Sequence, residues 1–146
     1  MEAIGSSSPW VDVEVIVLCV SSLRACGLAD PTLLISSMGC RADQQRSAEA
    51  LRQRLAPHRA TLCKDCQGRF EKNVFRVLDC KHPTCHALAW AQPSPFLLCQ
   101  DCQEHFEAVR RGLRAAQIAF DDTQVFARGL DYYTRTVFEV RAAWLG

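Results

Sequence analysis

Six of the nine cysteines lie between residues 63 and 102, and their spacing strongly constrains how the middle of the chain can fold. They form three pairs, two with the spacing Cys-x-x-Cys and one with four intervening residues. A Cys-x-x-Cys pair lets two thiolates converge on one cation at about 2.3 Å, and a second pair completes a tetrahedron. Zinc is the natural ion for four soft thiolates, whereas no spacing specific to iron–sulfur clusters is present. The block therefore predicts a structural zinc site.

Two Cys-x-x-Cys pairs, one on each side of a lobe, would hold the base of the lobe together by binding the same ion. This argument selects a first set of ligands: Cys63, Cys66, Cys99 and Cys102. The substitute ligands lie between these two pairs in the sequence: Cys80 and Cys85, with His82 or His86 as alternates. The competing interpretation treats the cysteines as small buried apolar residues. A redox role is disfavoured because the segment lacks the βαβ context of thioredoxin-like proteins.

Composition and charge narrow the class of protein. At 146 residues, with 49% hydrophobic and 23% charged residues, the chain can bury one core, or one core and a small lobe. A net charge of +1 gives the chain no overall excess of positive charge that would indicate nucleic-acid binding. The apolar run 13–20 is too short to span a bilayer and lacks the basic flank of a signal peptide. Nine cysteines without an export signal predict a reducing, cytoplasmic location with no membrane partner.

Hydrophobic periodicity predicts an α+β chain. Helices are expected from Asp12 to Gly27, from Ala42 to Leu55, and from Cys99 to about Gln117. Between about residues 60 and 102 this periodicity weakens and cysteine and proline concentrate, which indicates a separate lobe. Short strands are expected at Thr32–Ser36, Ile118–Phe120, Gln124–Ala127 and Thr136–Ala142.

The segment 128–139, Arg-Gly-Leu-Asp-Tyr-Tyr-Thr-Arg-Thr-Val-Phe-Glu, has the composition of a ligand site. On an extended segment, residues spaced by an even number share a face, so Arg128 and Tyr132 can reach one pocket. A guanidinium suits phosphate or carboxylate, and a tyrosine offers a flat wall with a hydroxyl at its tip. The alternative interpretation is an edge hairpin in which Tyr132 and Tyr133 are packing residues.

This segment closely resembles the histidine-specific signature LVRGLDYYxxTVFE of histidyl-tRNA synthetases. Further resemblances follow the family's order along the chain. Residues 2–16 are similar to the segment after class II motif 2, residues 35–39 to the I-N-S-I-G strand end, and residues 65–81 to DCxxRxxxNPLRxLDCK. The resemblance covers essentially the whole chain, but it covers only part of the sequence that is typical of the family.

The resemblance implies part of a class II antiparallel-sheet catalytic domain with a mostly helical, Cys-rich insertion lobe. Residues 1–59 and 117–146 would belong to the catalytic domain, and residues 60–116 to the lobe. Members of the family are homodimers that use ATP and Mg²⁺ to convert histidine to histidyl-adenylate, and then transfer the histidyl group to tRNA(His). Many relatives carry acidic or serine residues at the positions of Cys99 and Cys102, so a metal here would be a local stabiliser.

The resemblance also assigns roles to four residues. Arg128 matches the arginine that contacts the α-phosphate and the bound histidine, and Tyr132 and Tyr133 match the pair that lines the histidine pocket. Glu2 matches the acid that holds the substrate's α-ammonium. None acts as a general base, since such a reaction is accelerated mainly by positioning and charge stabilisation.

The chain also departs from the family pattern. It starts after motif 2 and stops before the GGRYD strand and motif 3, and Val74 replaces a usual proline. We therefore expect the isolated chain to form no histidyl-adenylate. The leading hypothesis is a fragment of a histidine–tRNA ligase, and the alternative is a non-catalytic zinc-binding interaction module derived from one.

Overall fold

The computed structural model describes residues 1–28, 30–91, 94–124, 126 and 132–142, which fold as α+β. Two compact units are present. The first comprises residues 1–37, 100–125 and 135–146, and the second comprises residues 38–99 and 126–134. Among the described residues, no helix is both long and apolar enough to cross a membrane.

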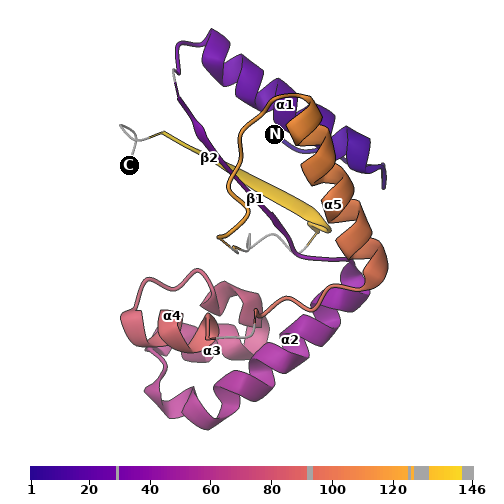
Figure 1. The fold of residues 1–146 in the computed structure, drawn as a ribbon. Coiled ribbons are helices and arrows are strands. Elements are labelled where there is room, and N and C mark those ends of the chain that lie inside the picture. The colour runs from indigo at the N-terminus through magenta and orange to yellow at the C-terminus, as the bar shows by residue number, and fades with distance from the viewer. Residues whose placement is uncertain (29, 92–93, 125, 127–131, 143–146) are drawn as a thin grey trace. The chain divides into compact units, whose positions relative to one another are not determined.

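The first unit combines two helices with a two-stranded antiparallel sheet (Figure 1). Its elements are α1 (Pro9–Ala25), β1 (Thr32–Ser37), α5 (Gln100–Ala115) and β2 (Thr136–Arg141). The register pairs Leu33 with Val140 and Ile35 with Phe138, so these four side chains share one face of the sheet. The strands expected at Thr32–Ser36 and Thr136–Ala142 are thus present and pair with each other.

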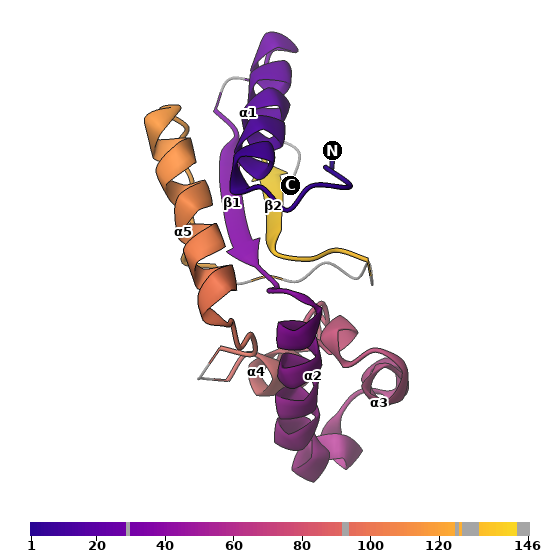
Figure 2. The ribbon, with the colours of Figure 1, turned by 90° about the vertical axis from the view of Figure 1, so that its right-hand side faces the viewer.

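The core of the first unit lies where α1 and α5 pack beside the strands (Figure 2). Its buried members come from both helices, from β1 and from the segment after α5: Ile16, Val20, Leu33, Ile35, Phe106, Val109, Leu113 and Ile118. The two helices approach closely at Gly112, where an added Cβ would lie 2.6 Å from a methyl group of Val13. Glycine therefore permits this helix contact.

Helix α1 begins three residues before the expected Asp12. Ser8 caps it, with its hydroxyl accepting a hydrogen bond from the Trp10 N–H at 3.3 Å, and Pro9 takes the first helical position. A serine followed by a proline is a strong signal for the start of a helix. Asp12 instead lies in the first turn, where its carboxylate faces α5.

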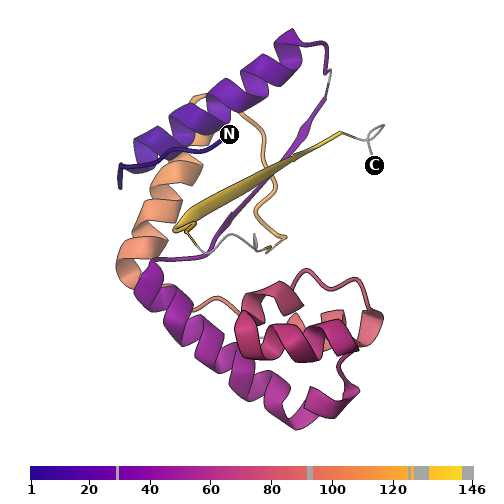
Figure 3. The same ribbon diagram turned by 180° about the vertical axis from the view of Figure 1, so that it is seen from behind.

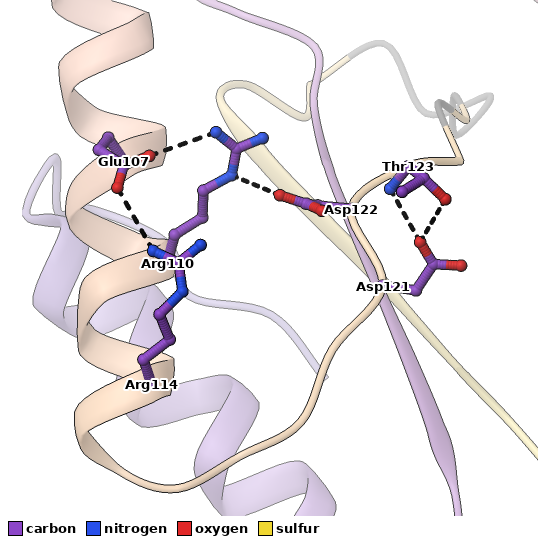
Figure 4. Close-up of polar contacts among 6 residues, drawn as sticks. All are labelled: Glu107, Arg110, Arg114, Asp121, Asp122 and Thr123. Atoms are coloured by element: carbon purple, nitrogen blue, oxygen red, sulfur yellow. Dashed lines mark hydrogen bonds and ion pairs between the residues drawn. The ribbon is translucent and has the colours of Figure 1, made fainter.

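The strand expected at Ile118–Phe120 is absent from the described structure. Only Asp121 bridges to β1, with its N–H donating to the Leu33 carbonyl at 2.8 Å and its carbonyl accepting from Ile35 at 3.0 Å. The Asp121 carboxylate then accepts hydrogen bonds from the Thr123 N–H and hydroxyl, which turns the chain (Figure 4). In the strand expected at 124–127, the described residues Gln124 and Phe126 are not extended into a ladder, and the others lie outside the described residues.

The second unit is helical. Its elements are α2 (Arg41–Leu55), η1 (Ala56–Thr61), α3 (Lys64–Lys72), η2 (Val74–Val77) and α4 (Pro83–Ala89). Figure 3 shows the short helices α3 and α4 beside the longer α2. The Arg54 guanidinium donates to the carbonyls of Ala89 and Ala91 at 3.2 and 2.7 Å, which anchors the end of α4 to α2.

The two units divide the chain differently from the expected segments 1–59, 60–116 and 117–146. Helix α2 belongs with the Cys-rich part because it contacts η2 and α4 and buries Leu51 and Leu55 fully. Helix α5 belongs with the first unit because Val109 and Leu113 enter the core against α1. Contacts between distant segments set the boundaries of these two units.

Candidate functional site

Four sulfur atoms meet in the second unit. The thiols of Cys63, Cys66, Cys80 and Cys85, here called the four-sulfur cluster, all lie within 4.8 Å of one another. The Sγ atoms of Cys63 and Cys80 are 3.9 Å apart. Cys66 and Cys85 are fully buried, Cys80 is 8% exposed, and Cys63 is partly exposed.

Three segments position the four-sulfur cluster. Cys63 occupies the N-cap position of α3 and Cys66 lies in its first turn, Cys80 follows η2, and Cys85 lies on α4. Backbone N–H groups point at two of the sulfurs. The Cys63 N–H donates to the Cys85 Sγ at 3.3 Å, and the His82 N–H donates to the Cys80 Sγ at 3.4 Å. Donors of this kind stabilise sulfur that carries negative charge.

The thiols of the four-sulfur cluster differ in acidity. The backbone N–H of Cys66 lowers the pKa of Cys63. Burial raises the pKa values of Cys66 and Cys85, because a thiolate loses hydration there. Burial therefore disfavours the thiolate form of these two groups.

The four-sulfur cluster differs from the first ligand set that spacing selected. It contains Cys63 and Cys66, but the substitutes Cys80 and Cys85 take the places expected for Cys99 and Cys102. Cys99 is the last residue of the segment 38–99 in the second unit, and Cys102 is buried on α5 in the first. The alternates His82 and His86 have exposed side chains, and His86 instead packs against Trp90 with 6.2 Å between ring centroids. Sequence spacing identified the cysteines as a group, and the structure brings Cys80 and Cys85, rather than Cys99 and Cys102, to Cys63 and Cys66.

A buried carboxylate joins the two ends of the helical part of the second unit. Asp43 is fully buried and accepts hydrogen bonds from the N–H of Cys40 at 3.3 Å and of Cys99 at 3.1 Å. The Arg46 guanidinium pairs with the same carboxylate. Nearby, the buried Ser47 hydroxyl accepts from the Leu97 N–H at 2.9 Å. Sequence reasoning missed Asp43, whose only signal was an acid in the first turn of a helix.

A pocket of about 320 Å³ opens on the same unit, between α2 and the segment from the end of α3 into η2. Its lining includes three cationic side chains, Arg41, Arg52 and Lys72, together with the amides of Gln44, Gln45 and Asn73. Among the lining residues that the structure describes, none has an acidic side chain. This composition suits an anion such as phosphate.

Tyr132 and Tyr133 also belong to the second unit. Their rings meet edge to face with centroids 4.8 Å apart, and Tyr132 is 53% exposed. The Gln44 side-chain amide donates to the Tyr133 carbonyl at 2.8 Å, which holds this backbone against α2. Arg128 lies outside the described residues. Glu2 is in the first unit, where its side chain is exposed.

A polar chain that sequence reasoning also missed connects three elements of the first unit. The buried His105 on α5 faces Asp12 of α1, with 2.8 Å between Nε2 and the carboxylate. Its Nδ1 lies 2.7 Å from a guanidinium nitrogen of Arg135, just before β2. Arginine can only donate, so Nδ1 accepts and the Nε2–H donates to Asp12. The ring is therefore held as one neutral tautomer.

On the same helix, Arg110 pairs with Asp122 at 2.7 Å and with Glu107 at 3.2 Å (Figure 4). The pair with Asp122 links the segment after α5 to the helix, whereas the pair with Glu107 lies within the helix. The Arg110 guanidinium is therefore paired with two carboxylates.

Known proteins resemble the chain over nearly its full length. It is 41% identical over 147 residues to the histidine–tRNA ligase of Syntrophomonas wolfei, covering 100% of this chain and 35% of the relative. It is 43% identical over 145 residues to that of Thermotoga petrophila, covering 99% and 34%. The structure of apo histidyl-tRNA synthetase from S. aureus superposes with a TM-score of 0.71 at 30% identity, over 94% of this chain and 33% of that one. The chain belongs to the histidyl-tRNA synthetase family.

The match confirms the resemblance noted in the sequence, although no protein-family model matches the chain. The chain spans about a third of the length of the curated synthetases that it matches. Its α+β architecture and two-stranded antiparallel sheet agree with the synthetase fold. Within that fold, the described part of this chain carries the tyrosine pair, the basic pocket and the four-sulfur cluster.

Proposed function

We propose that this chain supplies part of the histidine pocket of a histidine–tRNA ligase. In the whole protein, ATP and Mg²⁺ would activate histidine, and the histidyl group would pass to tRNA(His). The observation that carries the proposal is the similarity of the entire chain to proteins named histidine–tRNA ligase, at 37 to 43% identity in several bacteria.

The tyrosine pair has suitable chemistry for the proposed substrate. A phenol hydroxyl can donate to or accept from an imidazole nitrogen, and an aromatic wall packs against the imidazole ring. The edge-to-face contact between Tyr132 and Tyr133 limits the freedom of both rings before a ligand binds. Glu2 would hold the α-ammonium of histidine, as the resemblance assigns.

The proposal includes ATP, Mg²⁺, tRNA(His) and a homodimer because the resemblance to the family implies them. Arg128, assigned to the α-phosphate by resemblance, lies outside the described residues, so no catalytic step follows from its geometry. For tRNA, the basic pocket lined by Arg41, Arg52 and Lys72 supplies a local positive charge that the net charge of +1 does not.

A segment exchange tests this proposal. This chain would replace the matching segment of the Thermotoga petrophila ligase, and histidine-dependent ATP–pyrophosphate exchange would be measured. We expect exchange activity, and we expect Tyr132→Phe and Tyr133→Phe to raise the KM for histidine about tenfold or more, because each removes a hydrogen bond worth roughly 1.4 kcal/mol or more. Glu49→Gln, a change at an exposed residue of α2, is the matched control and should leave KM unchanged.

The same exchange made with the Aquifex aeolicus segment shows whether the host tolerates a foreign segment. If that chimera is active while a folded, ATP-binding chimera with this chain shows no histidine-dependent exchange, the proposal fails. That outcome would favour the non-catalytic zinc-binding interaction module.

A further inference from the structure

We propose that the second unit binds one structural zinc ion through four thiolates, those of Cys63, Cys66, Cys80 and Cys85. This inference does not rest on the proposed ligase function. A zinc–sulfur bond is about 2.3 Å long, so the sulfurs of a regular tetrahedral site are separated by about 3.8 Å. The observed 3.9 Å between Cys63 and Cys80, with all pairs within 4.8 Å, is close to that geometry.

Neither a disulfide nor simple apolar packing accounts for the four-sulfur cluster. A disulfide requires a separation of about 2.05 Å, whereas all four cysteines are free and the Cys63 and Cys80 sulfurs are 3.9 Å apart. Apolar packing leaves unexplained the backbone N–H groups of Cys63 and His82, which point at sulfur atoms. Such donors offset the two negative charges that would remain when four thiolates bind one Zn²⁺.

The elements around the four-sulfur cluster are short. Helix α3 has nine residues and α4 has seven, and η1 and η2 are 3₁₀ segments. Isolated helices shorter than about 12 residues are marginal in water, so these segments depend on tertiary contacts. An ion bound by α3, the turn after η2 and α4 would cross-link three short segments at one point.

The arrangement indicates a structural ion. All four positions would be taken by protein ligands, and three of the sulfurs are buried, so no open position remains for water or substrate. Removing the ion should therefore loosen the second unit first. The core of the first unit contains none of these four cysteines.

The test measures metal in the purified 146-residue chain after expression with zinc. We expect one zinc per chain in the wild type, and less than about 0.1 per chain in Cys66→Ser and Cys85→Ser. Cys26→Ser, a change at an exposed cysteine beyond α1, is the matched control and should keep one zinc. Cys99→Ser should also keep it, which separates the four-sulfur cluster from the set that spacing alone selected.

Cobalt provides a readout that remains informative if a serine variant fails to fold. The wild-type chain loaded with Co²⁺ should show tetrahedral d–d bands and charge-transfer intensity for four thiolates. Cys85→His should retain the metal and shift the spectrum to three thiolates and one imidazole. A wild-type chain that binds less than about 0.1 zinc when offered an equimolar amount overturns the proposal. Loss of zinc in Cys99→Ser together with its retention in Cys85→Ser also overturns it.

Discussion

Asp43 is the residue at which a single substitution should most clearly reveal how the second unit is closed. Asp43→Ala removes the carboxylate that accepts the N–H groups of Cys40 and Cys99. These two residues lie at opposite ends of the helical part of this unit, which runs from residue 38 to residue 99. The substitution therefore breaks a local helix cap and a contact between residues far apart in sequence.

The expected loss of stability follows from the two backbone N–H groups that lose their acceptor. A hydrogen bond to a charged group contributes about 1.5 kcal/mol or more, so losing two should cost about 3 kcal/mol. The Arg46 ion pair adds little, because its side chain is 57% exposed and such pairs contribute at most about 1 kcal/mol. A loss of about 3 kcal/mol is a large fraction of the roughly 5–15 kcal/mol by which domains are stable.

Urea unfolding followed by circular dichroism measures this loss. Asp43→Asn keeps one oxygen acceptor without its charge and should lose about half as much free energy of unfolding. The matched control is Glu49→Ala, which removes an exposed acid from the same helix and should cost less than about 0.5 kcal/mol. In Asp43→Ala, the amide of Cys99 should also exchange with deuterium faster than in the wild type. If Asp43→Ala costs no more than the control and the Cys99 exchange rate is unchanged, the reasoning is refuted.

Three further substitutions test separate parts of the structure. Gly39→Ala should cost about 3 kcal/mol in urea unfolding, because Gly39 has φ +73° and its Cβ would lie 2.5 Å from that of Asp43; a cost below about 1 kcal/mol would contradict this. Gly112→Ala should lower the melting temperature through a net loss of about 1–2 kcal/mol, since overpacking against α1 outweighs the gain in helix propensity; an increase would show that the helices can separate. Hydrogen bonds from Thr123 hold the pKa of Asp121 below its usual range, so this stabilisation is complete above about pH 4 and is lost as pH falls through the lowered folded-state pKa. Asp121→Asn should accordingly lose less stability than the wild type between about pH 5 and pH 2, and an identical acid dependence would rule out this contribution.

Elements with a clear local signal were predictable from the sequence. Helix α2 was expected from Ala42 to Leu55 and is observed from Arg41 to Leu55, because helix-forming residues run unbroken until the proline at position 57. The strand beginning at Thr32 was equally clear. The strand expected at Ile118–Phe120 was wrong because β propensity is realised only where a partner strand offers its edge, and in the described part of this segment just Asp121 pairs with β1.

At the candidate site, the sequence indicated which residue types matter but could not indicate which residues they contact. The sequence identified Tyr132, Tyr133 and the cysteines as chemically special, but spacing could not show that Gln44 holds the Tyr133 carbonyl. Nor could it reveal the tautomer of His105, which depends on residues 93 positions earlier and 30 positions later.

The sequence by itself determined the family, the α+β class, the main helices and the residue types of the proposed metal site. These depend on motif order, hydrophobic period and the chemistry of individual side chains. Only the tertiary structure decided which thiols meet. Cys80 and Cys85 join Cys63 and Cys66 because η2 and α4 fold back on α3, while the Asp43 carboxylate holds the backbone of Cys99 at the start of α2. Spacing along the chain cannot identify these partners, because distance in a folded protein is set by packing between segments.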